Sequence, residues 1–192
     1  GLTWAQDSAT DSTKLPLAGG TMTGAIVLGT NTVGGLQITT TATSNIGLGA
    51  NAVDSITTGD YNVGLGDGAG TALTSGSANV ATGFEALYSN TTASFNVANG
   101  YKALRTNTTG ANNIAVGYYA LNANTTASNN TAVGTNALVA NTTGASNTAI
   151  GVSALGANTT AANNTAIGYA SLRVNTTGTQ NAALGESSLY TN

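Results

Sequence analysis

The chain has 192 residues and a formal net charge of -3, and only 6% of its residues are charged. Four Lys and Arg cannot form the basic stripe that nucleic-acid binding requires, and no apolar run approaches the ~20 residues of a membrane helix. The chain has no His and no Cys. This excludes Ser-His-Asp and Cys-His catalytic sites, as well as zinc sites that use His or Cys ligands. We therefore expect no enzymatic activity, no cofactor, no partner nucleic acid and no membrane insertion.

The first 44 residues differ in composition from the remainder and divide into two segments. Residues 1–14 are polar and are interpreted as a connector. Residues 15–44 contain a Gly-Gly motif and two apolar stretches, 25–28 and 36–38, which predict strands of a small intertwined β-element. Because the chain begins with Gly and ends inside its repeat, we expect it to be part of a longer protein.

Residues 45–192 repeat with a period of 17 and no insertion, giving nine units of which the last is incomplete. Each unit carries an Asn, a Gly and a Leu at fixed offsets, as in Asn113, Gly117 and Leu121, in Asn130, Gly134 and Leu138, and in Asn147, Gly151 and Leu155. An Asn-Thr-Thr triplet follows in six of the units. A strict period indicates a repeat architecture in which neighbouring units supply a shared core.

Seventeen residues suit one coil with two short strands and two turns. Thr148-Ala149-Ile150 is typical of the first strand because Thr and Ile are β-branched. The Gly after it predicts a positive φ or a close backbone approach. We expect a second strand near Ala154-Leu155 and a return turn at Asn158-Thr159-Thr160, where Asn and Thr can bond their own backbone.

The unbroken period has a physical cause in strand pairing between coils. Each coil pairs with the next about 4.8 Å away, and one inserted residue would turn every later side chain to the opposite face. Equivalent residues should therefore align in columns, with amide ladders of Asn and an apolar spine of Leu from Leu87 to Leu189. The predicted fold class is all-β, a parallel β-solenoid or β-roll of 17-residue coils.

Both faces of the first strand are largely apolar, which predicts an oligomer. Ile46 and Leu48 share one face in the first unit, while small residues, mostly Ala, occupy the other face along the repeat. One coil has a single interior, so the second apolar face requires a partner. The core of each coil is also thin, and oligomerisation is the usual remedy for a small core.

Two motifs resemble known families. Asn147-Thr148-Ala149-Ile150-Gly151 resembles the head repeat of trimeric autotransporter adhesins, whose heads are trimeric parallel β-rolls with a shorter repeat. Leu15-Pro16-Leu17-Ala18-Gly19-Gly20-Thr21-Met22-Thr23-Gly24 is similar to a motif of phage tail-fibre proteins, in particular those of cyanophages. The resemblance implies an intertwined homotrimeric fibre on the virion, outside the cell. The implied partners are copies of itself, other fibre or baseplate proteins and a host cell-surface receptor. A bacterial cell surface is the alternative location.

Aromatic residues mark one candidate binding surface. Phe84, Tyr101 and Tyr118 occupy one offset in consecutive units, with Tyr119 beside them, so we expect the rings to stack. Two interpretations are open. The rings either bind glycans, or they pack within the sheet or between subunits, and packing is preferred.

A cluster of acidic residues is a second candidate, for a metal site. Asp54, Asp60 and Asp67 are close in sequence and offer the oxygen ligands that Ca²⁺ prefers. Solvated turn residues are the preferred interpretation, and no metal is predicted.

The sequence thus predicts a structural shaft segment of a phage tail fibre that positions a host-recognition tip. The first alternative is an adhesin-type binding module that contacts glycans or proteins of a host surface. The second alternative is an ice-binding solenoid, because columns of Thr can match an ice lattice.

Overall fold

The computed structural model describes residues 27–28, 31–32 and 44–191. The chain divides into two units, 1–34 and 35–192. In the first unit, β1 (Val27–Leu28) pairs antiparallel with β2 (Asn31–Thr32). β1 lies inside the first predicted apolar stretch, whereas β2 was not predicted. The Gly-Gly motif, the connector and the stretch 36–38 lie outside the described residues.

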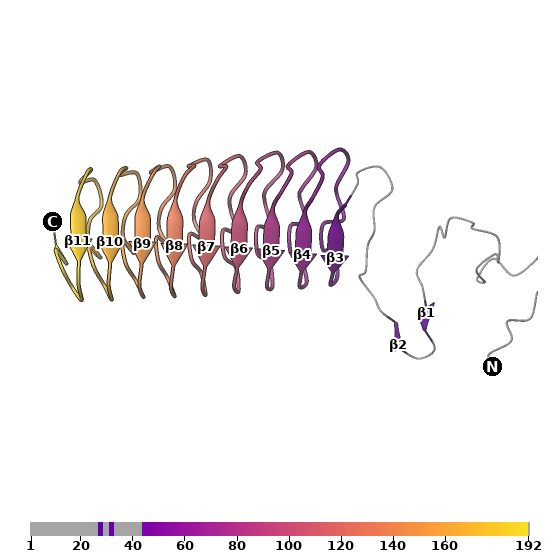
Figure 1. The fold of residues 1–192 in the computed structure, drawn as a ribbon, viewed down its shortest axis with the longest axis horizontal. Helices are drawn as coiled ribbons and strands as arrows, with labels where there is room; N and C mark the ends of the chain where they lie inside the picture. Colours follow the sequence, from indigo (N-terminus) through magenta and orange to yellow (C-terminus); the bar gives the residue numbers. More distant parts are fainter. Residues whose placement is uncertain (1–26, 29–30, 33–43, 192) are drawn as a thin grey trace, which may run out of the picture. The chain divides into compact units, whose positions relative to one another are not determined.

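The second unit contains one parallel sheet of nine three-residue strands. In chain order these are β3 (Ile46–Leu48), β4 (Val63–Leu65), β5 (Val80–Thr82), β6 (Val97–Asn99), β7 (Ile114–Val116), β8 (Thr131–Val133), β9 (Thr148–Ile150), β10 (Thr165–Ile167) and β11 (Ala182–Leu184). Each strand from β4 to β10 pairs with the strands one coil before and after it, whereas β3 and β11 each pair with one strand. Paired residues are 17 apart, as in Ala149 and Ala166. Figure 1 shows the resulting stack of coils. The predicted β-solenoid is confirmed, and no helix occurs in the part of the chain that the structure describes.

Each strand buries its middle residue and turns its two outer residues toward the solvent, as the two-residue period of a strand requires. The buried residue is Ala in β5 to β11 and Gly in β3 and β4. A methyl group added at Gly47 would lie 2.5 Å from the carbonyl oxygen of Ala52 and 2.7 Å from Cγ2 of Val53. The first coils therefore exclude even an Ala at this position.

The predicted second strand is wrong, because Ala154 and Leu155 lie in a turn. Ser153 and Leu155 have φ values of 57° and 51°, in the left-handed region. Both Ala154 and Leu155 are fully buried. Two consecutive inward side chains are impossible in a strand, whose side chains alternate between faces. The turn nevertheless bonds along the stack, since the backbone N–H of Leu155 donates to the carbonyl of Ser171 at 3.0 Å.

Leucine and alanine columns form the core. The Leu of each coil from Leu87 to Leu172 is fully buried, whereas Leu189 in the last coil is 48% exposed because no described coil covers it. Val53, Ile56 and Leu73 form a separate apolar cluster in the first two coils. Ile56 and Leu73 occupy the position that is Asn in the later coils, so apolar packing replaces the second asparagine column there.

Two buried asparagine columns run along the stack, which confirms the predicted ladders. In the first column, the side-chain amide of Asn113 donates to Oδ1 of Asn96 at 3.2 Å and to the carbonyl of Ala127 at 2.9 Å. In the second, the amide of Asn124 donates to Oδ1 of Asn107 at 2.8 Å and to the same Ala127 carbonyl at 3.0 Å. One carbonyl in this coil therefore joins both ladders, and the polar corner of the coil is hydrogen-bonded despite its burial.

The glycine that closes each strand behaves as predicted. Gly151 has a φ of 135°, and a Cβ added there would lie 2.3 Å from the carbonyl oxygen of Gly168 in the next coil. Both the backbone conformation and the close approach between coils therefore require Gly.

Candidate binding surface

The predicted aromatic stack is present on the surface of the solenoid. The ring centroids of Phe84 and Tyr101 are 5.4 Å apart, and those of Tyr101 and Tyr118 are 5.3 Å apart, with interplanar angles of 15° and 12°. Tyr119 packs edge-on against Tyr118, with the centroids 4.6 Å apart. The structure thus brings together all four aromatic residues that the sequence singled out.

A small charged cluster, which sequence reasoning missed, adjoins the stack. Glu85 Oε2 lies 2.6 Å from Nε of Arg105 and 3.7 Å from Nζ of Lys102. Lys102 Nζ is 5.1 Å from the centroid of the Tyr101 ring, and the Arg105 guanidinium lies 5.3 Å from that of Tyr88. The 17-residue period could have revealed this cluster, because Glu85 and Lys102 are one coil apart, as are Tyr88 and Arg105.

The electrostatics of this cluster keep Lys102 charged. A side-chain hydrogen bond with Tyr101 is the main cause that raises the pKa of Lys102 above its usual value, and Glu85 contributes further. Arg105 is the second cation that contacts this carboxylate. Two cations therefore share one carboxylate, and the cluster carries a small positive charge.

The geometry of the stack favours packing over glycan binding. A sugar ring binds against an open aromatic face, but the faces of Phe84, Tyr101 and Tyr118 are turned toward one another along the solenoid. Tyr119 contacts Tyr118 edge-on and reduces the remaining open area. A ligand at this surface would therefore contact the tyrosine hydroxyl groups and the edges of the rings.

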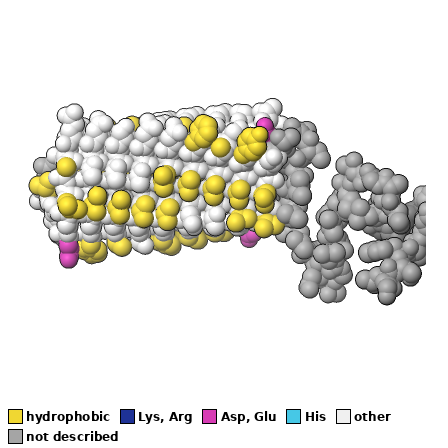
Figure 2. Space-filling view, in the orientation of Figure 1, with side chains coloured by type: hydrophobic (Ala, Val, Ile, Leu, Met, Phe, Trp, Pro, Cys, Tyr) yellow, Lys and Arg dark blue, Asp and Glu magenta, His cyan; other side chains and the backbone are white. Residues whose placement is uncertain are grey.

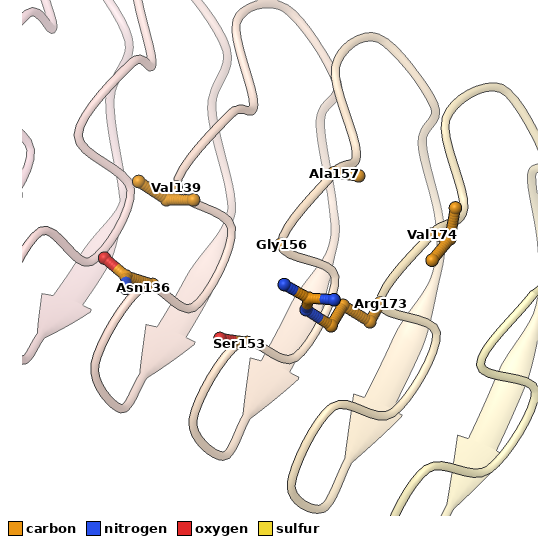
Figure 3. A pocket seen from close by; sticks show the side chains of 7 residues that line it. All are labelled: Asn136, Val139, Ser153, Gly156, Ala157, Arg173 and Val174. Carbon is orange, nitrogen blue, oxygen red and sulfur yellow. The ribbon is translucent and has the colours of Figure 1, made fainter.

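A surface depression lies elsewhere on the solenoid (Figure 3). It arises where Gly156 contributes no side chain between Val139 and Arg173, which occupy the same offset one coil before and after it. The side chains that line it are spread over successive coils and do not converge on one point. Arg173 is its one charged lining residue, and its Nη1 bonds to the hydroxyl of Tyr190 at 2.5 Å. The depression offers no set of groups for catalysis.

Two of the three clustered carboxylates accept separate hydrogen bonds. Asp67 Oδ1 accepts a hydrogen bond from the backbone N–H of Ala50 at 2.9 Å, and Asp54 Oδ1 accepts one from Ser55 at 3.4 Å. Within residues 44–191 and the short β1–β2 pair, no group of three potential ligands could hold a metal ion.

The paired threonines lie at a turn. Thr108 Oγ1 donates to the carbonyl of Thr125 in the next coil at 3.0 Å, whereas its neighbour Thr109 is exposed. The solenoid thus exposes one row of threonines, which runs along a turn. The ice-binding alternative would need a flat face with two rows of threonines, which this turn does not provide.

The outer face of the nine-stranded sheet exposes a series of apolar side chains. Ile46, Val80, Ile114, Ile150 and Leu184 are all exposed on it. No charged residue occupies either outer strand position from β3 to β11. Figure 2 shows this face with rows of hydrophobic side chains along the coils.

Comparison with known proteins gives no matching family model, no similar curated protein and no similar solved structure. Among the described residues there is also no helix of the length and hydropathy that a membrane span needs.

Proposed function

We propose that this chain is a structural shaft segment of a homotrimeric phage tail fibre, whose work is to hold a host-recognition tip away from the virion. The observation that carries the proposal is the mostly apolar, uncharged outer face of an unbroken nine-stranded sheet. Exposed apolar surface of this extent is characteristic of a protein–protein interface.

The internal construction supports a mechanical role. Backbone hydrogen bonds join each coil to the next through strands and turns alike, and two asparagine ladders run beside them. Pulling one coil from its neighbour would break all of these bonds together. The resemblance of residues 15–24 to tail-fibre proteins supplies the biological setting: partners are copies of itself, other fibre or baseplate proteins and a host receptor.

The decisive experiment is the mass of the purified chain in solution, measured by light scattering, together with negative-stain images. We expect three chains and a short rod. A monomeric mass at micromolar concentration would refute the homotrimeric shaft.

A second function, an adhesin-type binding module, is favoured by the cationic Lys102 beside exposed tyrosines. Binding of the chain to a glycan array, lost on Tyr118→Ala but retained on Tyr169→Ala, would establish it. An ice-binding role would require thermal hysteresis, and the corner position of the exposed threonines argues against it.

A further inference from the structure

The charged residues of the solenoid are unevenly distributed. Residues 86–185 contain no Asp or Glu, and their charged residues are Lys102, Arg105 and Arg173. Lys102 and Arg105 share the carboxylate of Glu85. Arg173, in contrast, forms no ion pair with any residue that the structure describes. The surface around Arg173 is therefore the place where an anion would find an uncompensated positive charge.

The depression beside Arg173 has the size of a small-molecule site. Its volume is about 390 Å³, within the range of about 300–1,000 Å³ that is usual for ligand pockets. The open space exists because Gly156 stands at an offset where Val139 and Arg173 carry side chains. Gly156 lies outside the left-handed region, and a Cβ added there would lie 3.1 Å from the carbonyl oxygen of Ser153, compared with 2.3 Å for the clash at Gly151. The fold therefore does not require Gly at residue 156 as strictly as it does at residue 151.

The lining of the depression combines polar and apolar groups. Ser153 and Asn136 both line it, and within the described part of the chain neither side chain makes a hydrogen bond. A hydroxyl and an amide can each donate and accept. Apolar surface comes from Val139, Ala157 and Val174. This mixture suits a ligand that carries hydroxyl groups together with patches of C–H.

Arg173 is held in place before any ligand arrives. Its Nη1 donates to the hydroxyl of Tyr190 at 2.5 Å, and its guanidinium lies 5.7 Å from the centroid of that ring. Figure 3 shows the guanidinium turned back from its own coil toward Gly156 and Ser153. Its other nitrogens donate no hydrogen bond to the described residues. A side chain that is already ordered loses less entropy on binding, and the remaining donors can hold a carboxylate.

We infer that this depression is a binding site for a carboxylated sugar within a carbohydrate chain. Arg173 pairs with the carboxylate, and Ser153 and Asn136 bond to hydroxyl groups of the chain. Because the lining groups are spread over successive coils, an elongated ligand that runs along the solenoid reaches more of them than a single ion does. The site is separate from the aromatic stack, and it does not depend on how many chains form the fibre.

A carbohydrate fits this site better than a peptide because the backbone around the depression is already bonded. The N–H of Ala157 donates to the carbonyl of Arg173 at 2.9 Å, and the N–H of Val174 donates to the carbonyl of Tyr190 at 2.9 Å. An extended peptide that adds to a sheet binds largely through main-chain hydrogen bonds with an open strand edge. The turn offers side chains instead, so it recognises a ligand through hydroxyl and carboxylate groups.

Titration calorimetry of the full chain with oligogalacturonate at low salt tests the site, because salt screens such contacts. The methyl ester of the same oligosaccharide is the matched uncharged ligand and should bind at least several-fold more weakly. Arg173→Gln should weaken binding of the acid by at least about tenfold. Gly156→Val fills the depression with the side chain that Val139 carries at the same offset, and it should abolish binding. Arg105→Gln, in the same column but paired with Glu85, is the control and should change binding little.

Thermal melts show whether each variant is folded, and R173Q keeps the test decisive if G156V is not. Equal affinity for the acid and its methyl ester would overturn the pairing with a carboxylate. Weaker binding in R105Q than in R173Q would place the ligand at the aromatic cluster and contradict the inference. Equal binding of oligoglutamate would exclude a site for carbohydrate, and no binding of oligogalacturonate at several millimolar would exclude the site itself. None of these measurements depends on the number of chains in the assembly, so light scattering tests the shaft separately.

Discussion

Removal of one asparagine amide from the inner ladder tests how the solenoid is held together. In Asn113→Ala, the side-chain bonds to Asn96 Oδ1 at 3.2 Å and to the Ala127 carbonyl at 2.9 Å are lost. Oδ1 of Asn113 also accepts the backbone N–H of Asn130 at 3.0 Å, and this acceptor disappears too. All of these groups are buried.

The three lost hydrogen bonds differ in how much unfolding free energy they cost. Asn96 Oδ1 still accepts the backbone N–H of residue 113, and the Ala127 carbonyl still accepts the amide of Asn124. The backbone N–H of Asn130 is left in the interior without an acceptor. Two lost bonds at about 1 kcal/mol each and one unsatisfied donor at about 1–3 kcal/mol predict a loss of about 3–5 kcal/mol in unfolding free energy.

Urea denaturation at equal chain concentrations measures this loss. Thr126→Ala, at an exposed turn position, is the matched control and should change the unfolding free energy by less than about 0.5 kcal/mol. A loss below about 1 kcal/mol for Asn113→Ala would refute the reasoning, because backbone stacking alone would then hold the coil.

Asn113→Asp gives the same test a pH dependence. The variant keeps an acceptor for Asn130, but its second oxygen meets the acceptors of Asn96 and Ala127, so the folded protein favours the neutral acid. The pKa of the new carboxyl is therefore raised above the unfolded value of about 3.9. The destabilisation should be full above the folded-state pKa and fade as the pH falls toward the unfolded value. A destabilisation independent of pH would contradict this account.

Three further predictions concern single columns. Gly151→Ala should lower stability by more than about 4 kcal/mol, since its Cβ would lie 2.3 Å from a backbone oxygen of the next coil; retained stability in thermal melts would contradict the tight stacking. Leu121→Ala should cost about 2–5 kcal/mol in urea denaturation, whereas Leu189→Ala, in the same column but half exposed, should cost much less. Tyr101→Leu should cost about 1–2 kcal/mol through two lost ring stacks, compared with almost nothing for Tyr169→Leu, and equal losses would show that stacking contributes little.

The sequence by itself determined the period, the first strand and the columns. Thr148–Ile150 was predicted residue for residue, and the buried Asn and Leu columns follow from the 17-residue spacing. The reason is that nine similar coils repeat each local preference, so one ambiguous signal becomes nine consistent ones. The aromatic stack was predictable for the same reason, since its members share an offset.

The tertiary structure alone decided the second half of each coil. Leu121 has a φ of 53°, a conformation that no local preference of Leu favours, and it persists because the backbone bonds between coils hold it there. The pairing of Glu85 with Arg105, 20 residues apart, likewise depends on which turn positions the coils bring together. Which face of each strand points outward also required the structure, because only the burial of the middle residue shows that Ile46 and Leu48 lie on the surface.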